Sequence, residues 1–146
     1  MVTRAFLKHH RRILIDTSVW IYHLEQHPEL ASAAGSVLDA VESGRVQAVV
    51  SELTLPELTV RPLQLGRQDV ADDYELLLDH FPNLELVPVD RAVLIEAAGL
   101  RARYRIRTPD SILLATGLLR GATAAVTNDA AWRSVPGMAT MLLSDA

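Results

Sequence analysis

A short apolar run that leads directly into a polar turn and then into a helical pattern constrains this chain most. Residues 13–15 read Ile-Leu-Ile, residues 16–18 read Asp-Thr-Ser, and apolar residues then recur at helical spacing. An apolar run of this kind is typical of a buried strand, and Asp or Ser before an apolar-periodic stretch is typical of a helix start. The chain therefore begins with a predicted strand–helix unit.

The same alternation continues to the end of the chain. Further strands are predicted at 46–50, 84–87, 124–126 and 138–143, and helices at 30–43, 54–60, 68–80, 90–104 and 108–120. The helix that starts at Thr54 is expected to end at Val60, because Arg61 precedes Pro62 and is biased out of helical geometry. The helix over 108–120 is apolar around most of its circumference, so we expect it in the middle of the domain. Strands that alternate with helices predict an α/β domain with a mostly parallel central sheet covered on both faces.

Length and composition exclude several classes of protein. The 146 residues fit one domain, and 49% hydrophobic with 22% charged residues is typical of a globular chain. There is no cysteine, so any metal must be held by oxygen or imidazole ligands. No apolar run is long enough for a signal-peptide core or a membrane span, so we expect a cytoplasmic protein without membrane association.

The charge of the chain is unevenly distributed. The net charge of −4 argues against a general nucleic-acid coat, which normally shows a basic surface. Basic residues nevertheless cluster at Arg101, Arg103, Arg105 and Arg107, and at Arg4, Lys8, Arg11 and Arg12. Both clusters have two open interpretations, a solvated face or a grip on RNA phosphates, and the run that ends at Arg107 is the better candidate for phosphate binding.

Four acidic residues stand at helix openings, where each has an ordinary structural explanation. Asp16 and Asp129 each follow a predicted strand and are good helix N-caps. Asp110 follows a Thr-Pro pair, with Thr108 as the expected N-cap and the acid favoured by the helix dipole. Glu57 lies three residues after Thr54, which matches a capping box. Taken singly, each acid is explained by local structure.

Taken together, the acids predict a metal site. In a parallel sheet, ligands bind outside the carboxyl ends of the strands, where three of these acids are expected. Two carboxylates about 4 Å apart repel by roughly 4 kcal/mol at an effective dielectric near 20, so four converging acids need a counter-cation. Carboxylates suit Mg²⁺ or Mn²⁺, which can activate water for hydrolysis of a nucleic-acid backbone. A phosphatase would need a second acid where Ser18 stands, and no glycine-rich turn supports dinucleotide binding.

Four segments resemble the successive motifs of one family. The segments ILIDTSVWIYHL, SELTLPELTVRPL, RTPDSILLATGL and AVTNDAAW are similar to those of PIN-domain ribonucleases of the VapC toxin type. The similarity covers nearly the whole chain from Arg12 onward. It implies a three-layer α/β/α PIN domain over residues 12–146, preceded by a basic N-terminal extension at residues 1–11.

The resemblance also implies a function and a set of site residues. It implies an Mg²⁺- or Mn²⁺-dependent endoribonuclease that acts as the toxin of a type II toxin–antitoxin pair, forms a homodimer and is inhibited by an antitoxin protein. The family's catalytic and metal-binding acids fall on Asp16, Glu57, Asp110 and Asp129. Substrate-binding or supporting residues fall on Ser18, Thr127 and Asn128, to which the basic run adds Arg107. The alternative is a catalytically silent domain that binds its antitoxin or RNA.

The sequence departs from the family pattern in two places. Arg105 stands at a turn where the family usually has glycine, so either the turn differs or a non-glycine residue is held at positive φ. The N-terminal extension is longer than usual, and three interpretations are open: it contacts RNA, it is an unstructured overhang, or the start of the chain is misassigned.

Four aromatic residues outside the acidic motifs have structural interpretations. Trp20 and Trp132 are expected in the core or in a dimer interface and not as base-stacking residues. His23 and His27 are one helical turn apart, a spacing that could hold a metal, but we expect them to be exposed at a helix end.

Overall fold

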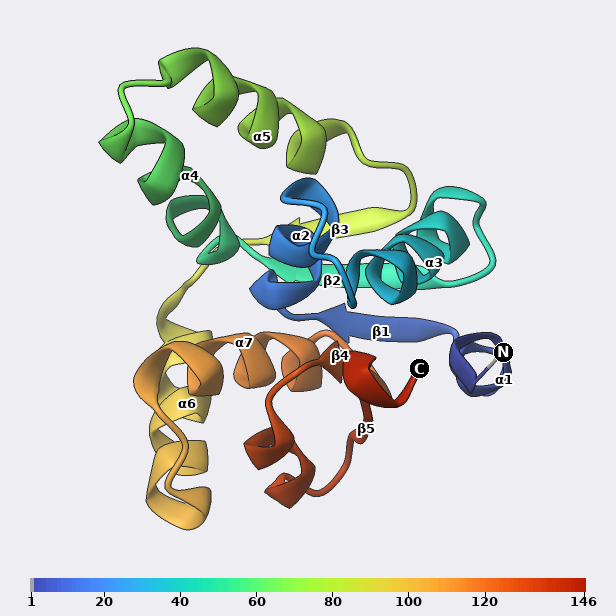
Figure 1. Ribbon diagram of the computed structural model, residues 1–146. Helices are drawn as coiled ribbons and strands as arrows, with labels where there is room; N and C mark the ends of the chain where they lie inside the picture. The colour runs from blue at the N-terminus through green and yellow to red at the C-terminus, as the bar shows by residue number, and fades with distance from the viewer. Residues whose placement is uncertain (1) are drawn as a thin grey trace.

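The computed structural model describes residues 2–146, so Met1 of the predicted extension lies outside the described residues. The strands are β1 (Arg12–Ile15), β2 (Gln47–Ser51), β3 (Leu84–Val87), β4 (Ala124–Thr127) and β5 (Ala139–Leu142). The helices are α1 (Val2–Leu7), α2 (Thr17–Leu24), α3 (Ala31–Glu42), α4 (Thr54–Gln64), α5 (Gln68–His80), α6 (Arg91–Tyr104) and α7 (Thr108–Leu119), with 3₁₀ turns η1 (Ala130–Ser134) and η2 (Leu143–Asp145). The predicted strand–helix alternation is confirmed (Figure 1).

All five strands pair in parallel in the order β3-β2-β1-β4-β5. The chain builds outward from β1 to β2 and β3, then crosses back to place β4 on the other side of β1. This reversal makes a switch point between β1 and β4, and in open parallel sheets ligands bind outside the carboxyl ends of the strands at such a point. The predicted α/β fold with a parallel central sheet is confirmed.

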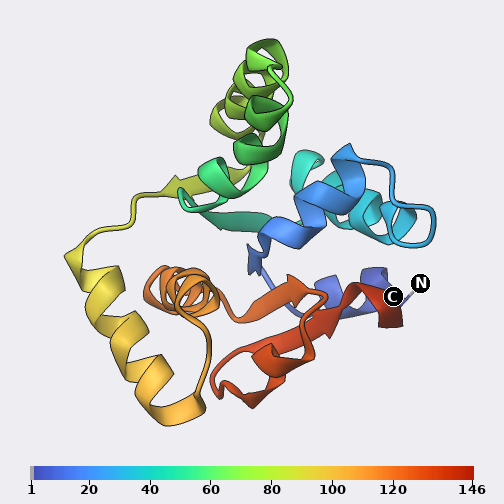
Figure 2. The same cartoon turned by 60° about the vertical axis from the view of Figure 1, so that its left-hand side comes forward.

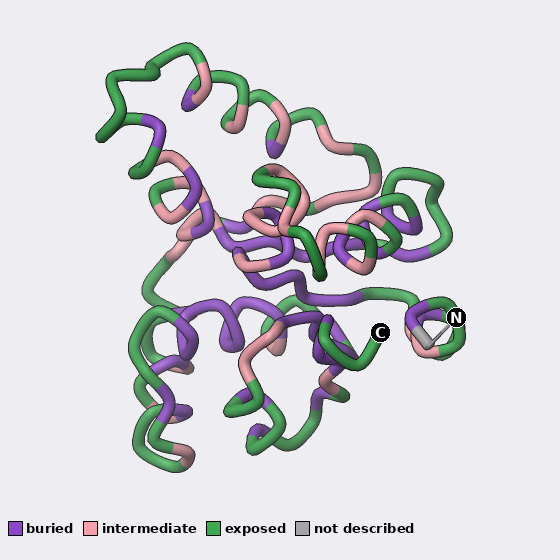
Figure 3. Tube along the Cα trace, viewed as in Figure 1, coloured by how far each residue is buried: buried purple, intermediate pink, exposed green. Residues whose placement is uncertain are grey.

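Helices cover both faces of the sheet, as Figure 2 shows, with α2 and α3 on one face and α6 and α7 on the other. Each face has its own apolar core, one built around Trp20 and the other around Trp132. Both indole rings are fully buried, so the core interpretation of these residues is confirmed and base stacking is excluded. Burial is continuous from Asp110 to Gly117 of α7, as predicted for the central helix (Figure 3). Within residues 2–146, no helix has the length and apolarity needed to cross a membrane.

The predicted end of α4 at Val60 is wrong, because the helix continues through Pro62 to Gln64. Pro62 lies in the last turn, where the missing N–H removes only one helical bond. Its ring is buried, and its carbonyl oxygen accepts hydrogen bonds from the backbone N–H groups of Leu65 at 3.1 Å and Arg67 at 2.8 Å. These contacts offset the local bias against helix before proline.

Two further expectations concern the departures from the family pattern. Residues 2–7 form α1, whose Thr3 and Leu7 are buried, with Leu7 in the same core as residues of α3, so an unstructured overhang is wrong for this part of the extension. Arg105 has φ 54° and ψ 37° at the end of α6, so the turn is kept with a non-glycine residue in the left-handed region. That conformation costs roughly 1–2 kcal/mol for a residue with a Cβ.

Substitution of Gly117 tests how closely α7 packs on the sheet. A Cβ at Gly117 would lie 2.9 Å from Cβ and Cδ2 of Leu14 in β1 and 3.0 Å from Cε of Met138. We expect Gly117→Ala to lower the free energy of unfolding by about 1–2 kcal/mol, because overpacking outweighs the gain in helix propensity of about 1 kcal/mol. Urea denaturation followed by circular dichroism measures the change.

Gly35→Ala in α3 is the matched control, since its Cβ would meet only Nδ1 of His23 at 3.7 Å. That variant should be stabilised by about 0.5–1 kcal/mol. Equal effects of the two substitutions would contradict the packing proposed for α7.

Candidate active site

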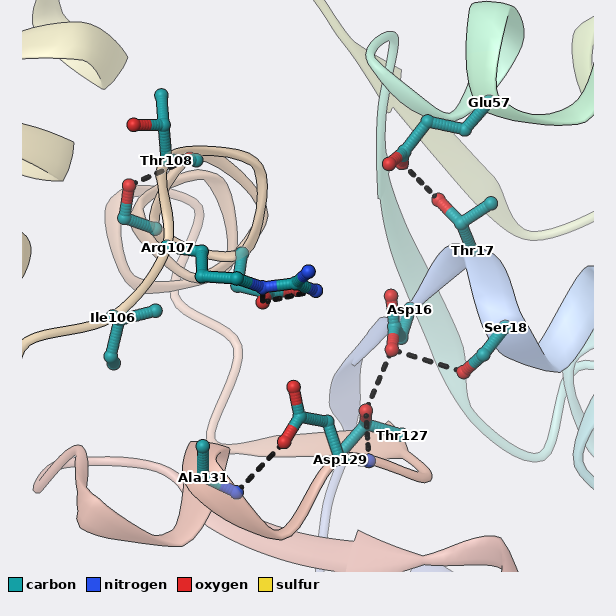
Figure 4. A network of polar contacts seen from close by, with 12 residues as sticks. Asp16, Thr17, Ser18, Glu57, Ile106, Arg107, Thr108, Thr127, Asp129 and Ala131 are labelled. Atoms are coloured by element: carbon teal, nitrogen blue, oxygen red, sulfur yellow. Dashed lines mark hydrogen bonds and ion pairs between the residues drawn. The ribbon is translucent and has the colours of Figure 1, made fainter. Parts of the chain in front are cut away.

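Asp16 lies directly after β1 and points across the carboxyl edge of the sheet. It occupies the N-cap position of α2, but its side chain makes no capping hydrogen bond. Its Oδ2 instead accepts hydrogen bonds from the hydroxyl of Thr127, at 2.6 Å, and from the hydroxyl of Ser18, at 3.0 Å (Figure 4). Thr127 is the last residue of β4, so the switch point itself positions this carboxylate. Asp16 is therefore the N-cap residue, as predicted, but its carboxylate does not cap the helix.

Glu57 faces the same space from the first turn of α4. Its Oε1 accepts a hydrogen bond from the hydroxyl of Thr17 at 2.7 Å, and the hydroxyls of Thr17 and Thr54 are 2.9 Å apart. The predicted capping box is wrong, because the N-cap of α4 is Leu53 and makes no side-chain cap bond. Thr54 is already inside the helix, and its hydroxyl forms a hydrogen bond with that of Thr17 in α2. Sequence reasoning missed Thr17, whose place next to Asp16 at the start of α2 was the available signal.

Asp110 lies in the first turn of α7 and is buried, with 8% of its surface exposed. The N-cap of this helix is Arg107, one residue before the predicted Thr108. Both Nε and Nη2 of Arg107 lie 3.2 Å from Oδ2 of Asp110, and the Arg107 side chain remains 79% exposed. The arginine that we predicted to grip phosphate is thus also the immediate partner of one acid.

Asp129 opens η1, as predicted. Its Oδ1 accepts a hydrogen bond from the backbone N–H of Ala131 at 2.9 Å, and its own N–H donates to the hydroxyl of Thr127 at 3.0 Å. Thr127 therefore links Asp129 to Asp16. Figure 4 shows the carboxyl groups of Asp16, Glu57 and Asp129 turned toward one space, into which Arg107 extends.

The acids perturb one another. Burial raises the pKa of Asp16; the hydrogen bonds from Thr127 and Ser18 oppose this rise, and the negative charge of Asp110 adds to it. Burial also raises the pKa of Glu57; the Thr17 hydrogen bond and Arg107 oppose this rise, and the charges of Asp16 and Asp110 add to it. Ionisation of either carboxyl group at this position therefore costs free energy that a nearby cation would offset.

The donor atoms fit a hard divalent cation, since the side chains at the centre other than Arg107 offer carboxylate or hydroxyl oxygen. Within residues 2–146, no three acidic or histidine side chains are grouped closely enough to hold a metal ion by themselves. Mg²⁺ usually binds through one or two carboxylates and keeps several water ligands, so it does not require three grouped carboxylates. The donor set thus fits Mg²⁺ with water completing its ligand shell.

The remaining candidates have structural contacts away from this centre. Asn128 uses its Oδ1 to accept the backbone N–H of Ser144 at 3.1 Å, which ties η2 to the end of β4. His23 and His27 lie at the end of α2 and just beyond it, as expected, but are half-buried and not exposed. The Nδ1 of His27 accepts the backbone N–H groups of Glu29 and Leu30, both at 3.1 Å, which steers the chain into α3.

Solved structures with similar folds come from several bacteria. A toxin–antitoxin complex from Klebsiella pneumoniae has 20% identity and a TM-score of 0.69, and covers 88% of this chain and 96% of that chain. VapBC2 from Rickettsia felis bound to a promoter DNA fragment has 15% identity and a TM-score of 0.70, covering 90% and 98%. FitAcB from Neisseria gonorrhoeae has 20% identity and a TM-score of 0.66, covering 88% and 96%. At these identities the likeness concerns the fold.

Sequence comparisons give a narrower result. A search of curated protein sequences finds no match. The model of the PIN domain family matches residues 13–138, which include all four acids and the sheet except the first residue of β1 and the whole of β5. The chain therefore belongs to the PIN domain family.

Proposed function

We propose that this protein is a metal-dependent endoribonuclease of the VapC toxin type, which hydrolyses RNA phosphodiester bonds at Asp16, Glu57, Asp110 and Asp129. The observation that carries the proposal is the convergence of the carboxyl groups of Asp16, Glu57 and Asp129 on one space at the switch point. Burial, with the charge of Asp110 added, raises the pKa of Asp16, and burial, with the charges of Asp16 and Asp110 added, raises that of Glu57. Groups of acids with perturbed pKa values are typical of functional sites. Membership of the PIN domain family supports the same function.

Mg²⁺ or Mn²⁺ would be held by Asp16 and Asp110, with Glu57 and Asp129 as direct or water-mediated ligands. When bound, the ion would supply Lewis-acid stabilisation of the charge that develops on the phosphoryl oxygens and would acidify a water molecule. It would also offset the repulsion between the acidic site and a polyanionic substrate.

The protein's own residues position the acids and handle the proton. Ser18 and Thr127 hold Oδ2 of Asp16, which leaves the other carboxylate oxygen available to the site. Thr17 fixes Glu57, whose raised pKa makes it a suitable acceptor for the proton of the attacking water. Attack forms the new P–O bond as the bond to the leaving oxygen breaks, and that oxygen takes up a proton.

Arg107 would bind a substrate phosphate beside this centre. Its guanidinium is largely exposed, and Asp110 orients it toward the acids through two N–H groups. Asn128 stays a predicted supporting residue next to Thr127, with its oxygen committed to Ser144.

The partner we propose is a cognate antitoxin, and the protein would act in the cytoplasm as a homodimer. One of the solved structures with a similar fold is a toxin–antitoxin complex, which supports this assignment. Exposed apolar side chains on α4 and just beyond its end, Val60, Leu63 and Leu65, are 46–67% accessible and offer contact area for a partner.

Substitution of the acids tests the proposed enzyme. We expect Asp16→Asn and Asp110→Asn to lower the rate of RNA cleavage by about 100-fold or more, because each removes a charged group that acts in the transition state. EDTA should abolish cleavage by the wild type. The exposed Asp79→Asn variant in α5 is the control and should keep the wild-type rate. Cleavage that resists EDTA would contradict the proposal, and binding of RNA or antitoxin without cleavage under any divalent ion would support the silent alternative.

The dependence of folding stability on pH tests the electrostatics of the site. Because the folded pKa of Asp16 is raised above 3.8, the folded state binds protons more tightly than the unfolded state, and stability falls as pH rises through the folded pKa. We therefore expect Asp16→Asn to be more stable than the wild type at pH 7, with the difference shrinking as pH falls through the raised folded pKa toward the unfolded value of 3.8. Mg²⁺ should raise the melting temperature of the wild type at pH 7 and raise that of Asp16→Asn much less. Equal stabilisation of both proteins by Mg²⁺ would contradict metal binding at Asp16.

Arg107→Gln tests phosphate binding. We expect a higher KM for RNA, with the largest effect at low salt, since an exposed cation contributes through electrostatic attraction that salt screens. Steady-state cleavage of a fluorogenic oligoribonucleotide over a salt series measures this effect. Arg91→Gln, at the start of α6, is the charge-matched control. A KM that shifts equally at low and high salt would argue against a phosphate contact.

A further inference from the structure

A basic pocket lies at the opposite edge of the sheet from the acids. It has a volume of about 680 Å³ and lies where α1 leads into β1 and where the α3–β2 turn approaches it (Figure 1). Four cationic side chains line it, Lys8, Arg11, Arg12 and Arg45, together with His10 and Gln47. No acidic residue is among the described residues that line this pocket.

Two of these cations are available to a ligand. Lys8 and Arg11 are exposed and form no ion pair within residues 2–146. Arg12 is partly neutralised by Glu85 at 3.9 Å, and Nε of Arg45 donates to the hydroxyl of Ser43 at 3.1 Å. The pocket therefore keeps a local excess of positive charge in a chain whose net charge is −4.

The backbone around the pocket is well supported. The N–H of Gln47 donates to the carbonyl oxygen of Arg11 at 2.8 Å, and His10 contacts the hydroxyl of Thr123 through Nδ1 at 2.8 Å. Leu7 anchors the preceding helix in the core. Lys8 and Arg11 are thus presented from a fixed main chain, which lowers the entropy lost when they bind a ligand.

We propose that this pocket, with Lys8 and Arg11 as its principal contacts, is a second binding site for the phosphate backbone of single-stranded RNA. The inference rests on the proposed function, which supplies the RNA. A polyanion is favoured because the lining is cationic and largely exposed, as in sequence-independent backbone binding. The site lies outside the catalytic centre and adds affinity for long substrates.

The size of the sheet sets a length requirement for the RNA. Arg11 precedes β1 and Asp16 follows it, so five residue steps separate the two edges, about 16 Å at 3.3 Å per residue. At about 3.4 Å per stacked nucleotide, a stacked strand needs about five nucleotides to span this distance. RNA shorter than this can occupy the catalytic site without touching the basic pocket.

Binding of a labelled oligouridylate in EDTA tests the proposal without cleavage. Fluorescence anisotropy over a salt series gives the slope of log K against log salt. Each phosphate contact contributes about 0.7 to this slope, so we expect the slope of Lys8→Gln/Arg11→Gln to be shallower than that of the wild type by about 1.4. The double variant Arg67→Gln/Arg91→Gln makes the same change in net charge away from the pocket and should keep the wild-type slope. Circular dichroism confirms that each variant is folded.

Length dependence provides the second readout. With Mg²⁺, Lys8→Gln/Arg11→Gln should raise the KM for an oligomer of about twenty nucleotides and leave that for one of about four unchanged. Identical slopes for the two double variants, no RNA binding by the wild type, or equally tight binding of polyglutamate would overturn the proposal. Intact, Lys8- and Arg11-dependent binding without cleavage would instead refute the proposed ribonuclease and leave the RNA site standing.

Discussion

Repulsion between carboxylates is the constraint on which the rest of this site depends. Asp16, Glu57 and Asp110 raise one another's energy when ionised, and burial of Asp16 and Glu57 adds to that cost. The fold opposes it with neutral hydroxyl donors: Ser18 and Thr127 donate to Asp16, and Thr17 donates to Glu57. Hydroxyl donors hold a carboxylate in place without neutralising it. The negative potential that remains is what a divalent cation would bind.

The parallel sheet brings these groups together from distant parts of the chain. β1 and β4 are adjacent only because the chain returns to the centre of the sheet after β3, which places Asp16 and Thr127 side by side although 111 positions separate them. The order of the strands therefore matters more to the site than the identity of any one helix. The apolar runs of the strands and the apolar circumference of α7 predicted this architecture well, since burial on both faces leaves a strong signal in sequence.

Local rules failed where a tertiary contact competed with them. Pro62 was expected to end α4, but its position in the last turn and its buried ring made the loss of one hydrogen bond tolerable. Asp16 and Glu57 were expected to cap helices, whereas hydroxyl groups of other elements donate hydrogen bonds to both carboxylates. Asp129 is the acid whose capping prediction is confirmed, because its partner is only two residues away. The role of Thr17 and the pairing of Arg107 with Asp110 depend on side-chain direction, which residue spacing alone does not specify.

The distribution of charge has a consequence that the net value of −4 conceals. Carboxylates gather where the strands end, whereas Lys8, Arg11, Arg12 and Arg45 surround the place where β1 and β2 begin. A cation placed beside the acids would compete with a metal ion, as the contact between Arg107 and Asp110 illustrates. Cations at the far edge can attract a polyanion without that competition, because about 16 Å exceeds the Debye length of about 8–10 Å at physiological ionic strength. Placing the cations and the carboxylates at opposite edges of one sheet therefore keeps the two kinds of charge from neutralising each other.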